Sequence, residues 1–184
     1  MMRAVVLVVL ISLAGACSHI QGVLGPAKDS KQDARSRVER SLAAGNYESA
    51  GSIIINEKKK RKDPRLFDDL YVRAINGLVN EGRKDLEEGD PFRAGKKFNK
   101  TLNYISAHPL PSGKAGISGK DLLFLISESS SSMHNEAIMH YRNGELDKAI
   151  SLWEDILKFD PRNSEVKKAL RTAKIQRKNL RSIE

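Results

Sequence analysis

Cysteine is nearly absent from this chain, and aromatic residues are scarce. The 184 residues include one cysteine, Cys17, and aromatic side chains make up 5% of the composition. A single thiol has no partner for an intramolecular disulfide, and it cannot complete a paired-cysteine metal or redox site. The fold must therefore be held together by side-chain packing and polar contacts alone.

Sequence signatures of catalysis are also missing. The chain has no glycine-rich phosphate loop, no serine elbow and no carboxylate cluster typical of acid–base catalysis. Two of its histidines, His134 and His140, are six residues apart and do not share a helix face well, which disfavours a metal site. We therefore expect that the protein is not an enzyme and that it binds no cofactor, no metal and no small-molecule substrate.

The alternation that marks a half-buried strand does not occur over any useful length. Apolar residues recur instead at three- and four-residue intervals, and 40% hydrophobic with 30% charged residues suits a soluble, helix-rich protein. We predict an all-α fold. The expected helices are 29–44, 46–62, 64–88, 91–107, 120–142, 146–159 and 163–182.

Two local features of these helices stay open or depend on packing. Serine is a mediocre helix former, so the run Ser127–Ser132 either kinks its helix or supplies small side chains where two helices approach closely. In the last helix, the apolar positions expected to face inward are Val166, Leu170, Ala173 and Leu180.

The charge balance is strongly positive. A formal net charge of +9 keeps a protein soluble or attracts it to anionic lipid, polysaccharide or nucleic acid. One basic run is either a solvated helix end or a contact for an anionic partner, and it consists of Lys58, Lys59, Lys60, Arg61 and Lys62. The last helix is also basic, but its cations surround it and no aromatic residue accompanies them, so we expect no nucleic-acid binding.

The first residues are typical of a targeting signal. The positive segment Met1–Arg3 precedes the apolar run Ala4–Leu13, which is too short to cross a bilayer as a stable helix. Small residues follow and end at Cys17. The stretch Leu13–Cys17 (Leu-Ala-Gly-Ala-Cys) resembles the cleavage and lipidation site of a bacterial lipoprotein. The resemblance implies that 1–16 is a signal peptide and that acyl chains such as palmitate on Cys17 anchor the protein in a membrane.

The residues after this cysteine indicate a location and a tether. Ser18, rather than aspartate, follows it, which in the lipoproteins that the signal resembles implies the outer membrane, with the body in the periplasm. The outer face of an inner or cytoplasmic membrane is the alternative, and a plain signal peptide with a chance cysteine is the competing interpretation. Glycine and proline interrupt 17–28, so we expect this stretch to tether a folded domain at 29–182.

One spacing recurs three times. A glycine is followed five residues later by alanine and four residues later again by a large apolar residue, as Gly45–Ala50–Ile54, Gly89–Ala94–Phe98 and Gly144–Ala149–Trp153. We expect the glycine to end a helix, the alanine to let two helices approach and the large residue to fill the groove between them. The pattern resembles the tetratricopeptide repeat, and the third copy matches best, through Ala137, Ala149, Trp153 and Pro161.

The resemblance implies a short solenoid of stacked antiparallel helical hairpins. The hairpins are expected at about 29–62, 64–107 and 119–161, with a capping helix at 163–182. Tetratricopeptide arrays usually bind peptides in a groove lined by the first helix of each hairpin. The partner-binding positions that follow are Asn76, Arg83, His134 and Tyr141, while Trp153 is expected to be a packing residue.

The sequence thus predicts a lipid-anchored envelope scaffold or adaptor. It is expected to bind protein partners by peptide or helix docking and to assist the assembly or positioning of a secretion, pilus or outer-membrane complex. The alternative is a cell-wall or anionic-lipid-binding accessory lipoprotein that uses its basic patches.

Overall fold

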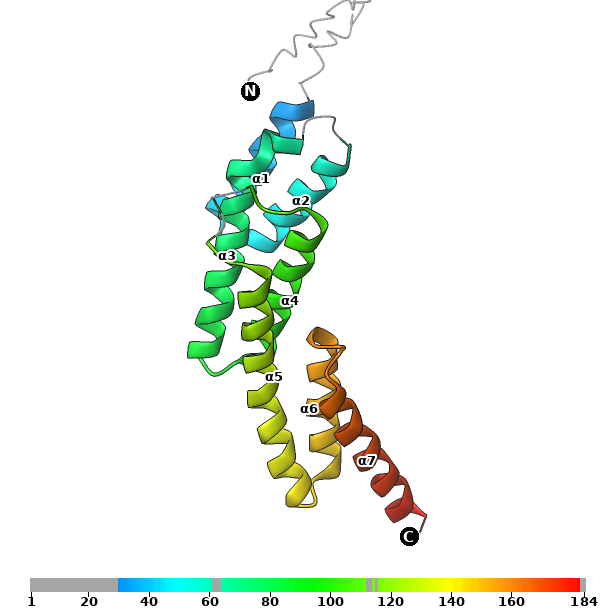
Figure 1. Cartoon of the computed structure of the whole chain (residues 1–184). Coiled ribbons are helices and arrows are strands. Elements are labelled where there is room, and N and C mark those ends of the chain that lie inside the picture. The colour runs from blue at the N-terminus through cyan, green and yellow to red at the C-terminus, as the bar shows by residue number, and fades with distance from the viewer. Residues whose placement is uncertain (1–29, 61–63, 112–113, 115, 183–184) are drawn as a thin grey trace, which may run out of the picture.

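The computed structural model describes residues 30–60, 64–111, 114 and 116–182 (Figure 1). Every regular element within these ranges is helical, which confirms the all-α prediction. The elements are α1 (Ser30–Ala43), α2 (Tyr47–Lys60), the 3₁₀ helix η1 (Pro64–Phe67), α3 (Asp68–Glu87), α4 (Pro91–Ala107), α5 (Gly119–Arg142), α6 (Leu146–Phe159) and α7 (Ser164–Arg181). The predicted signal peptide and tether, including Cys17, and the basic residues Arg61 and Lys62 lie outside the described residues.

Three glycines reverse the chain after α1, α3 and α5, as the repeated spacing predicts. Gly45, Gly89 and Gly144 have φ angles of +72°, +79° and +79°, a left-handed conformation that favours glycine. At the start of α4, the Asp90 carboxylate accepts a hydrogen bond of 2.9 Å from the Arg93 backbone N–H, and proline follows the cap directly. Local sequence chemistry therefore determines where these helices end and begin.

The helices form antiparallel pairs that follow one another along an elongated molecule (Figure 1). α1 packs on α2, α3 on α4, and α5 on α6, and the pairs are joined by contacts of α2 with α3 and of α4 with α5. α7 packs on α6. The described chain therefore begins at one end of the molecule, with α1, and finishes at the other end, with α7.

The core runs between these pairs and is built on the repeated spacing. Its alanines and large apolar residues are at most 2% exposed: Ala50, Ala94, Ala149, Ile54, Phe98 and Trp153. Gly82 of α3 lies so close to Phe98 that an added Cβ would stand 2.5 Å from Cε1 of the ring. Small residues on one helix thus make room for a ring on the next.

The serine run lies within an unbroken α5. Ser129 and Ser130 are buried, and the Ser129 hydroxyl donates 2.9 Å to the carbonyl of Leu125 one turn earlier. The side-chain amide of Asn163, which caps α7, donates 2.9 Å to the Ser130 hydroxyl. The small serines therefore let the α6–α7 turn approach α5 closely, which supports the second of the two alternatives that the sequence leaves open.

Two predicted features differ in the structure. The segment that starts at Pro64 forms η1 rather than the first turn of α3, and this turn directs Phe67 into the core, where it is fully buried. In α7, Val166 and Ala173 are buried as expected, but Leu180 is 51% exposed. The reason is that α7 is the last described helix and packs mainly on α6, so its final turns have no second neighbour.

Candidate functional site

A groove lies between α5, α6 and α7, far from α1. We call it the α5–α7 groove. Its volume is about 390 Å³, and it is lined by His134, Ile138, Tyr141, Trp153, Glu165, Lys168, Ala169 and Thr172. Two of the sequence-predicted binding residues, His134 and Tyr141, therefore face the same groove. Its α7 wall was not predicted, because the sequence does not show on which face of α5 and α6 the last helix packs.

A hydrogen bond between two side chains fixes the floor of this groove. Trp153 is 2% exposed, and its indole Nε1–H donates 2.9 Å to Nδ1 of His134. Because Nδ1 accepts this bond, a neutral His134 carries its proton on Nε2. Nε2 lies 3.6 Å from a carboxylate oxygen of Glu165 on the α7 side. The imidazole is thus held from behind and presents its second nitrogen toward the opposite wall.

Aromatic and apolar surface surrounds this pair. The rings of His134 and Tyr141 are tilted against the indole of Trp153, with centroid distances of 6.1 Å and 5.8 Å. Ile138 supplies further apolar surface, and Lys168 and Thr172 supply polar groups along the α7 wall. Fixed rings with a few polar groups at the edge suit contact with a peptide segment.

The same hydrogen bond limits which nitrogen of His134 could exchange a proton with another molecule. Its Nδ1 is occupied by the indole N–H and cannot take a proton from a substrate. The other histidine of this helix, His140, contacts the carboxylates of Glu145 and Glu136 instead. Within the described ranges, no three histidine, cysteine, aspartate or glutamate side chains gather so that they could hold a metal ion.

The other two predicted binding residues, Asn76 and Arg83, lie on α3 and do not line this groove. Asn76 is half-buried beneath the connection between α4 and α5, where a Cβ added to Gly116 would stand 3.2 Å from its Oδ1. Arg83 is exposed. The tetratricopeptide resemblance implied one groove for all four residues, but the long connection between α4 and α5 covers part of the α3 surface beside Asn76.

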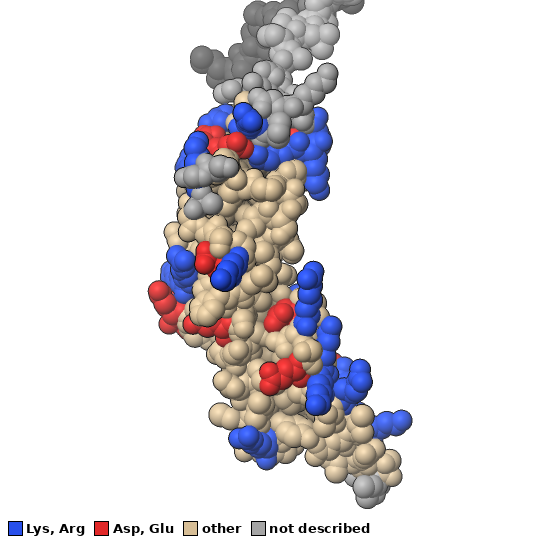
Figure 2. All heavy atoms as spheres, in the orientation of Figure 1, with Lys and Arg blue, Asp and Glu red and all other residues tan. Residues whose placement is uncertain are grey.

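The basic run at the end of α2 divides into two kinds of lysine. The Lys58 side chain is 6% exposed, and its Nζ lies 2.6 Å from Asp68 Oδ1 and 5.3 Å from the ring centroid of Tyr71. Lys58 therefore links α2 to α3 inside the protein. Lys59 and Lys60 are exposed. Figure 2 shows Lys and Arg side chains gathered at this end of the molecule, where α1 also begins.

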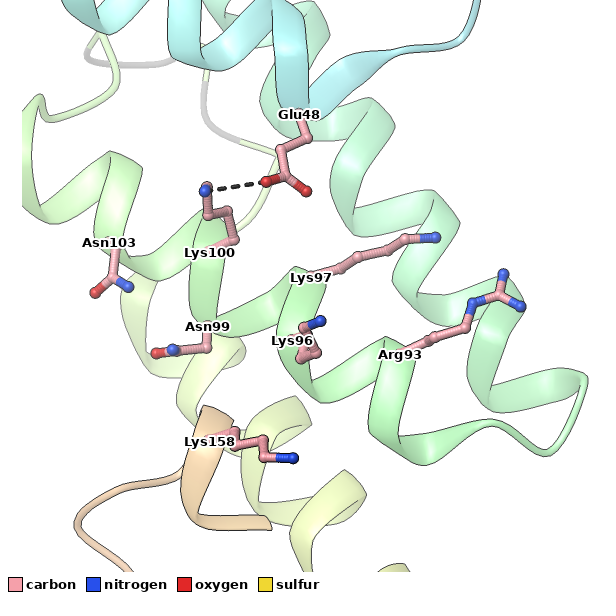
Figure 3. Close-up of a pocket in the computed structure, with 8 residues that line it drawn as sticks. All are labelled: Glu48, Arg93, Lys96, Lys97, Asn99, Lys100, Asn103 and Lys158. Carbon is pink, nitrogen blue, oxygen red and sulfur yellow. Dashed lines mark ion pairs between the residues drawn. The ribbon is translucent and has the colours of Figure 1, made fainter. Parts of the chain in front are cut away.

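Sequence reasoning missed a further hollow along α4, which we call the α4 cleft (Figure 3). Its volume is about 320 Å³, and it is lined by Glu48, Arg93, Lys96, Lys97, Asn99, Lys100, Asn103 and Lys158. Five cations and one carboxylate in such a lining resemble a site for an anion. The sequence signal that could have found it is the series of cations at three- and four-residue intervals on α4.

Carboxylates of the protein already compensate most of these cations. Arg93 Nη2 lies 2.7 Å from Asp85 Oδ1 and Lys97 Nζ lies 2.8 Å from Asp85 Oδ2, with the Asp85 side chain only 3% exposed. The remaining pairs are Lys100 with Glu48 at 3.0 Å and Lys158 with Asp155 at 2.5 Å. Of the five, Lys96 alone has no ion pair to the described residues. The α4 cleft therefore stabilises a buried carboxylate rather than offering uncompensated charge to a ligand.

Comparison with known proteins adds no family to this description. No protein-family model matches the chain, and no curated protein is significantly similar to it. Among the described residues, none of the helices combines the length and the apolar character needed to cross a membrane. The class that the fold defines is an all-α protein in which consecutive helices pack on their neighbours.

Proposed function

We propose that this protein is a lipid-anchored scaffold of the bacterial cell envelope that binds a segment of a partner protein in the α5–α7 groove. The observation that carries the proposal is the Trp153–His134 pair, since a buried indole fixes an imidazole at the floor of a groove that has room for a peptide. Such pre-ordering lowers the entropy that binding must overcome.

The proposed architecture is a short solenoid that resembles tetratricopeptide arrays. Support comes from the three turn glycines, each followed by a buried alanine and a buried large residue in the next helix. In an array of this kind, each hairpin buries its apolar face against the next, and grooves form where neighbouring helices diverge. The groove proposed here lies at the last of these junctions, between α5, α6 and α7.

The proposed anchor is Cys17, which follows the lipoprotein-like stretch Leu13–Cys17. Because α1 begins at one end of the molecule and the α5–α7 groove lies toward the other, an anchor before α1 would attach the membrane at the end opposite the groove. This arrangement suits a protein that presents a binding site to an outer-membrane, secretion or pilus complex in the periplasm. Outer-membrane anchoring is the version we propose, because Ser18 follows the cysteine.

A photo-crosslinking amino acid at Thr172, on the exposed rim of the groove, tests this function in cells. We expect a discrete covalent adduct with one envelope protein and none from the same amino acid at Asn80 on α3. The same amino acid at Lys168 serves as a second probe of the groove. Thr172→Arg places a large cation in the groove and should abolish the adduct formed from position 168. The matched control is Gln176→Arg, which adds the same charge to an exposed position of α7 outside the lining. Equal adducts in all variants would exclude the groove as the partner site.

The anchor is tested separately. Wild-type protein should incorporate labelled palmitate and fractionate with membranes, whereas Cys17→Ser should do neither. If Cys17→Ser protein still fractionates with membranes and wild-type protein remains unlabelled, the lipid anchor is wrong, while groove binding keeps its own test.

A second candidate function is contact with cell-wall polymer or anionic lipid. It is favoured by the exposed lysines Lys59 and Lys60, which lie at the end of the molecule where the proposed anchor enters. Lys59→Glu/Lys60→Glu should then reduce co-sedimentation with cell-wall sacculi or with anionic vesicles and leave the Lys168 adduct unchanged. Unchanged sedimentation would exclude this contact and leave groove binding as the proposed function.

A further inference from the structure

The α6–α7 groove is a second hollow on α7, with a lining that shares no residue with the α5–α7 groove. Its volume is about 490 Å³, and it is lined by Leu157, Lys167, Leu170, Arg171, Lys174, Ile175 and Lys178. Leu157 and Leu170 are half-buried between the two helices, and Ile175 is 57% exposed beside them. The floor of the groove is therefore apolar and open to solvent.

The cations of the α6–α7 groove form a regular row. Lys167, Arg171, Lys174 and Lys178 follow one another at intervals of four, three and four residues, so they lie along one face of α7. With a rise of about 1.5 Å per residue, the row is roughly 16 Å long, or about three helical turns. The groove thus has the length of a short helix, with an apolar floor and one charged edge.

The charge of this row is largely uncompensated. α7 contains seven cations and one carboxylate, Glu165. Within the row, Lys174 pairs with Glu154 at 2.6 Å. Lys167, Arg171 and Lys178 have no ion pair to any residue that the structure describes. In the α4 cleft, by contrast, carboxylates of the protein face the cations. The cations of this row are therefore available for ion pairs with another molecule.

We propose that the α6–α7 groove binds an acidic amphipathic helix of a partner protein. Carboxylates spaced three and four residues apart along one side of that helix would face the cationic row, and its apolar side would cover Leu157, Leu170 and Ile175. The apolar floor supplies most of the affinity, because exposed ion pairs contribute little each, and the row of charges fixes orientation and register. This surface is separate from the α5–α7 groove and does not depend on it.

The shape of the floor favours a helix over an anionic bilayer. Two of its three apolar side chains lie between α6 and α7 rather than projecting beyond the cations, so a flat surface would meet charge before it met apolar atoms. A docked helix would instead lie against α6 and α7 as each helix of this molecule lies against its neighbours. The final turns of α7, where Leu180 is exposed, have no second neighbour in the described structure.

The test uses a labelled synthetic peptide of about 18 residues that carries leucines on one helical face and glutamates at heptad-like spacing beside them. We expect the full chain to bind it, as measured by fluorescence anisotropy, and to bind a scrambled peptide of the same composition at least tenfold more weakly. Arg171→Glu/Lys178→Glu should weaken binding at least tenfold, and Ile175→Ser should weaken it several-fold. The matched control is Arg73→Glu/Arg142→Glu, which makes the same change in net charge at exposed positions on α3 and α5 and should leave the affinity unchanged.

Three results would overturn the proposal. Equal binding of the scrambled peptide would show attraction by charge alone, and unchanged binding by Arg171→Glu/Lys178→Glu would place the peptide elsewhere. In a parallel experiment with phosphatidylglycerol vesicles, the bilayer would be the occupant if Arg171→Glu/Lys178→Glu weakened vesicle binding and left peptide binding intact. Circular dichroism melts of all variants should match the wild type, because the substituted side chains are exposed and make no ion pair in the described structure.

Discussion

The second and third helix pairs place different aromatic side chains at the same position. Nine residues after the turn glycine, the α3–α4 pair has Phe98 and the α5–α6 pair has Trp153. On the facing helices, 55 residues apart in the sequence, Val79 corresponds to His134. Val79 is 3% exposed and Phe98 is fully buried, whereas His134 is half-buried and accepts a hydrogen bond from Trp153.

At this position the α3–α4 pair has only packing residues, whereas the α5–α6 pair has residues that also line a groove. Phenylalanine and valine fill space and leave nothing unsatisfied. Tryptophan fills the same space but carries an N–H that must find a partner when it is buried. The third pair meets this need with an imidazole that also lines the α5–α7 groove, so a packing requirement has placed a polar group at the surface. The comparison predicts that the two pairs respond alike to loss of packing and differently to loss of polarity.

Removal of either ring is expected to have the largest effect. Phe98→Ala and Trp153→Ala should each lower the free energy of unfolding by about 3–5 kcal/mol, because both side chains are buried and leave a cavity. Urea unfolding followed by circular dichroism measures this loss, since Trp153 is the only tryptophan and its fluorescence is lost with it. Leu123→Ala, at a position that is 57% exposed, is the control and should change stability by less than about 0.5 kcal/mol. A loss below about 1 kcal/mol for Trp153→Ala would contradict the packing described here.

The small residue at the matching position of α3 and α5 should give the next largest effect. Gly82 in the second pair corresponds to Ala137 in the third, and a Cβ on Gly82 would stand 2.5 Å from Phe98 Cε1. Gly82→Ala should therefore destabilise by about 1–2 kcal/mol, because overpacking outweighs the better helix propensity of alanine. Ala137→Gly should lose a similar amount, about 1–2 kcal/mol, through lost packing and poorer propensity.

Urea unfolding of these two variants sharpens the comparison because their volume changes have opposite signs. Asn80→Ala, on the exposed side of α3, is the control and should be neutral or slightly stabilising. If Gly82→Ala raised the stability, it would contradict the close packing of the Phe98 ring against α3.

Loss of the polar contact should cost less and should occur in the third pair alone. In a double-mutant cycle of Trp153→Phe and His134→Val, we expect a coupling energy of about 1 kcal/mol, the usual net contribution of one hydrogen bond. The double variant copies the Phe98–Val79 pair and should be more stable than His134→Val alone, which leaves the indole N–H unsatisfied. Additive effects of the two substitutions would mean that this hydrogen bond contributes nothing to stability.

Features set by neighbouring residues were predictable from the sequence, and those set by distant segments were not. The left-handed glycines and the Asp90 cap depend on chemistry within a few residues, and the all-α fold depends on periodicity that the sequence displays directly. The cover over Asn76 depends on the path of the connection between α4 and α5. Burial of the Lys58 ammonium depends on Asp68 in the following helix, and exposure of Leu180 depends on the lack of a second neighbour, among the described helices, for the final turns of α7. Spacing within a helix predicts which residues share a face, but it does not predict which segment packs against that face.

The smallest expected effect concerns the attachment of α7, where packing is thinnest. Arg177 Nη1 lies 2.7 Å from Asp147 Oδ1 of α6, and this hydrogen bond holds the pKa of Asp147 below its ordinary value of 3.8. A carboxylate with a lowered pKa stabilises the folded state above its ordinary pKa, and this stabilisation is lost as the pH falls through the folded pKa. Hydrogen exchange of α7 amides should therefore rise, relative to those of α4, when the pH falls below about 4. Asp147→Asn should show the faster exchange already at neutral pH and a weaker dependence on acid, whereas Asp155→Asn, whose lysine partner lies within α6, should behave as the wild type. Equal pH dependence in the wild type and Asp147→Asn would show that other carboxylates govern the acid response, and the ion pair to α6 would then not hold α7 in place.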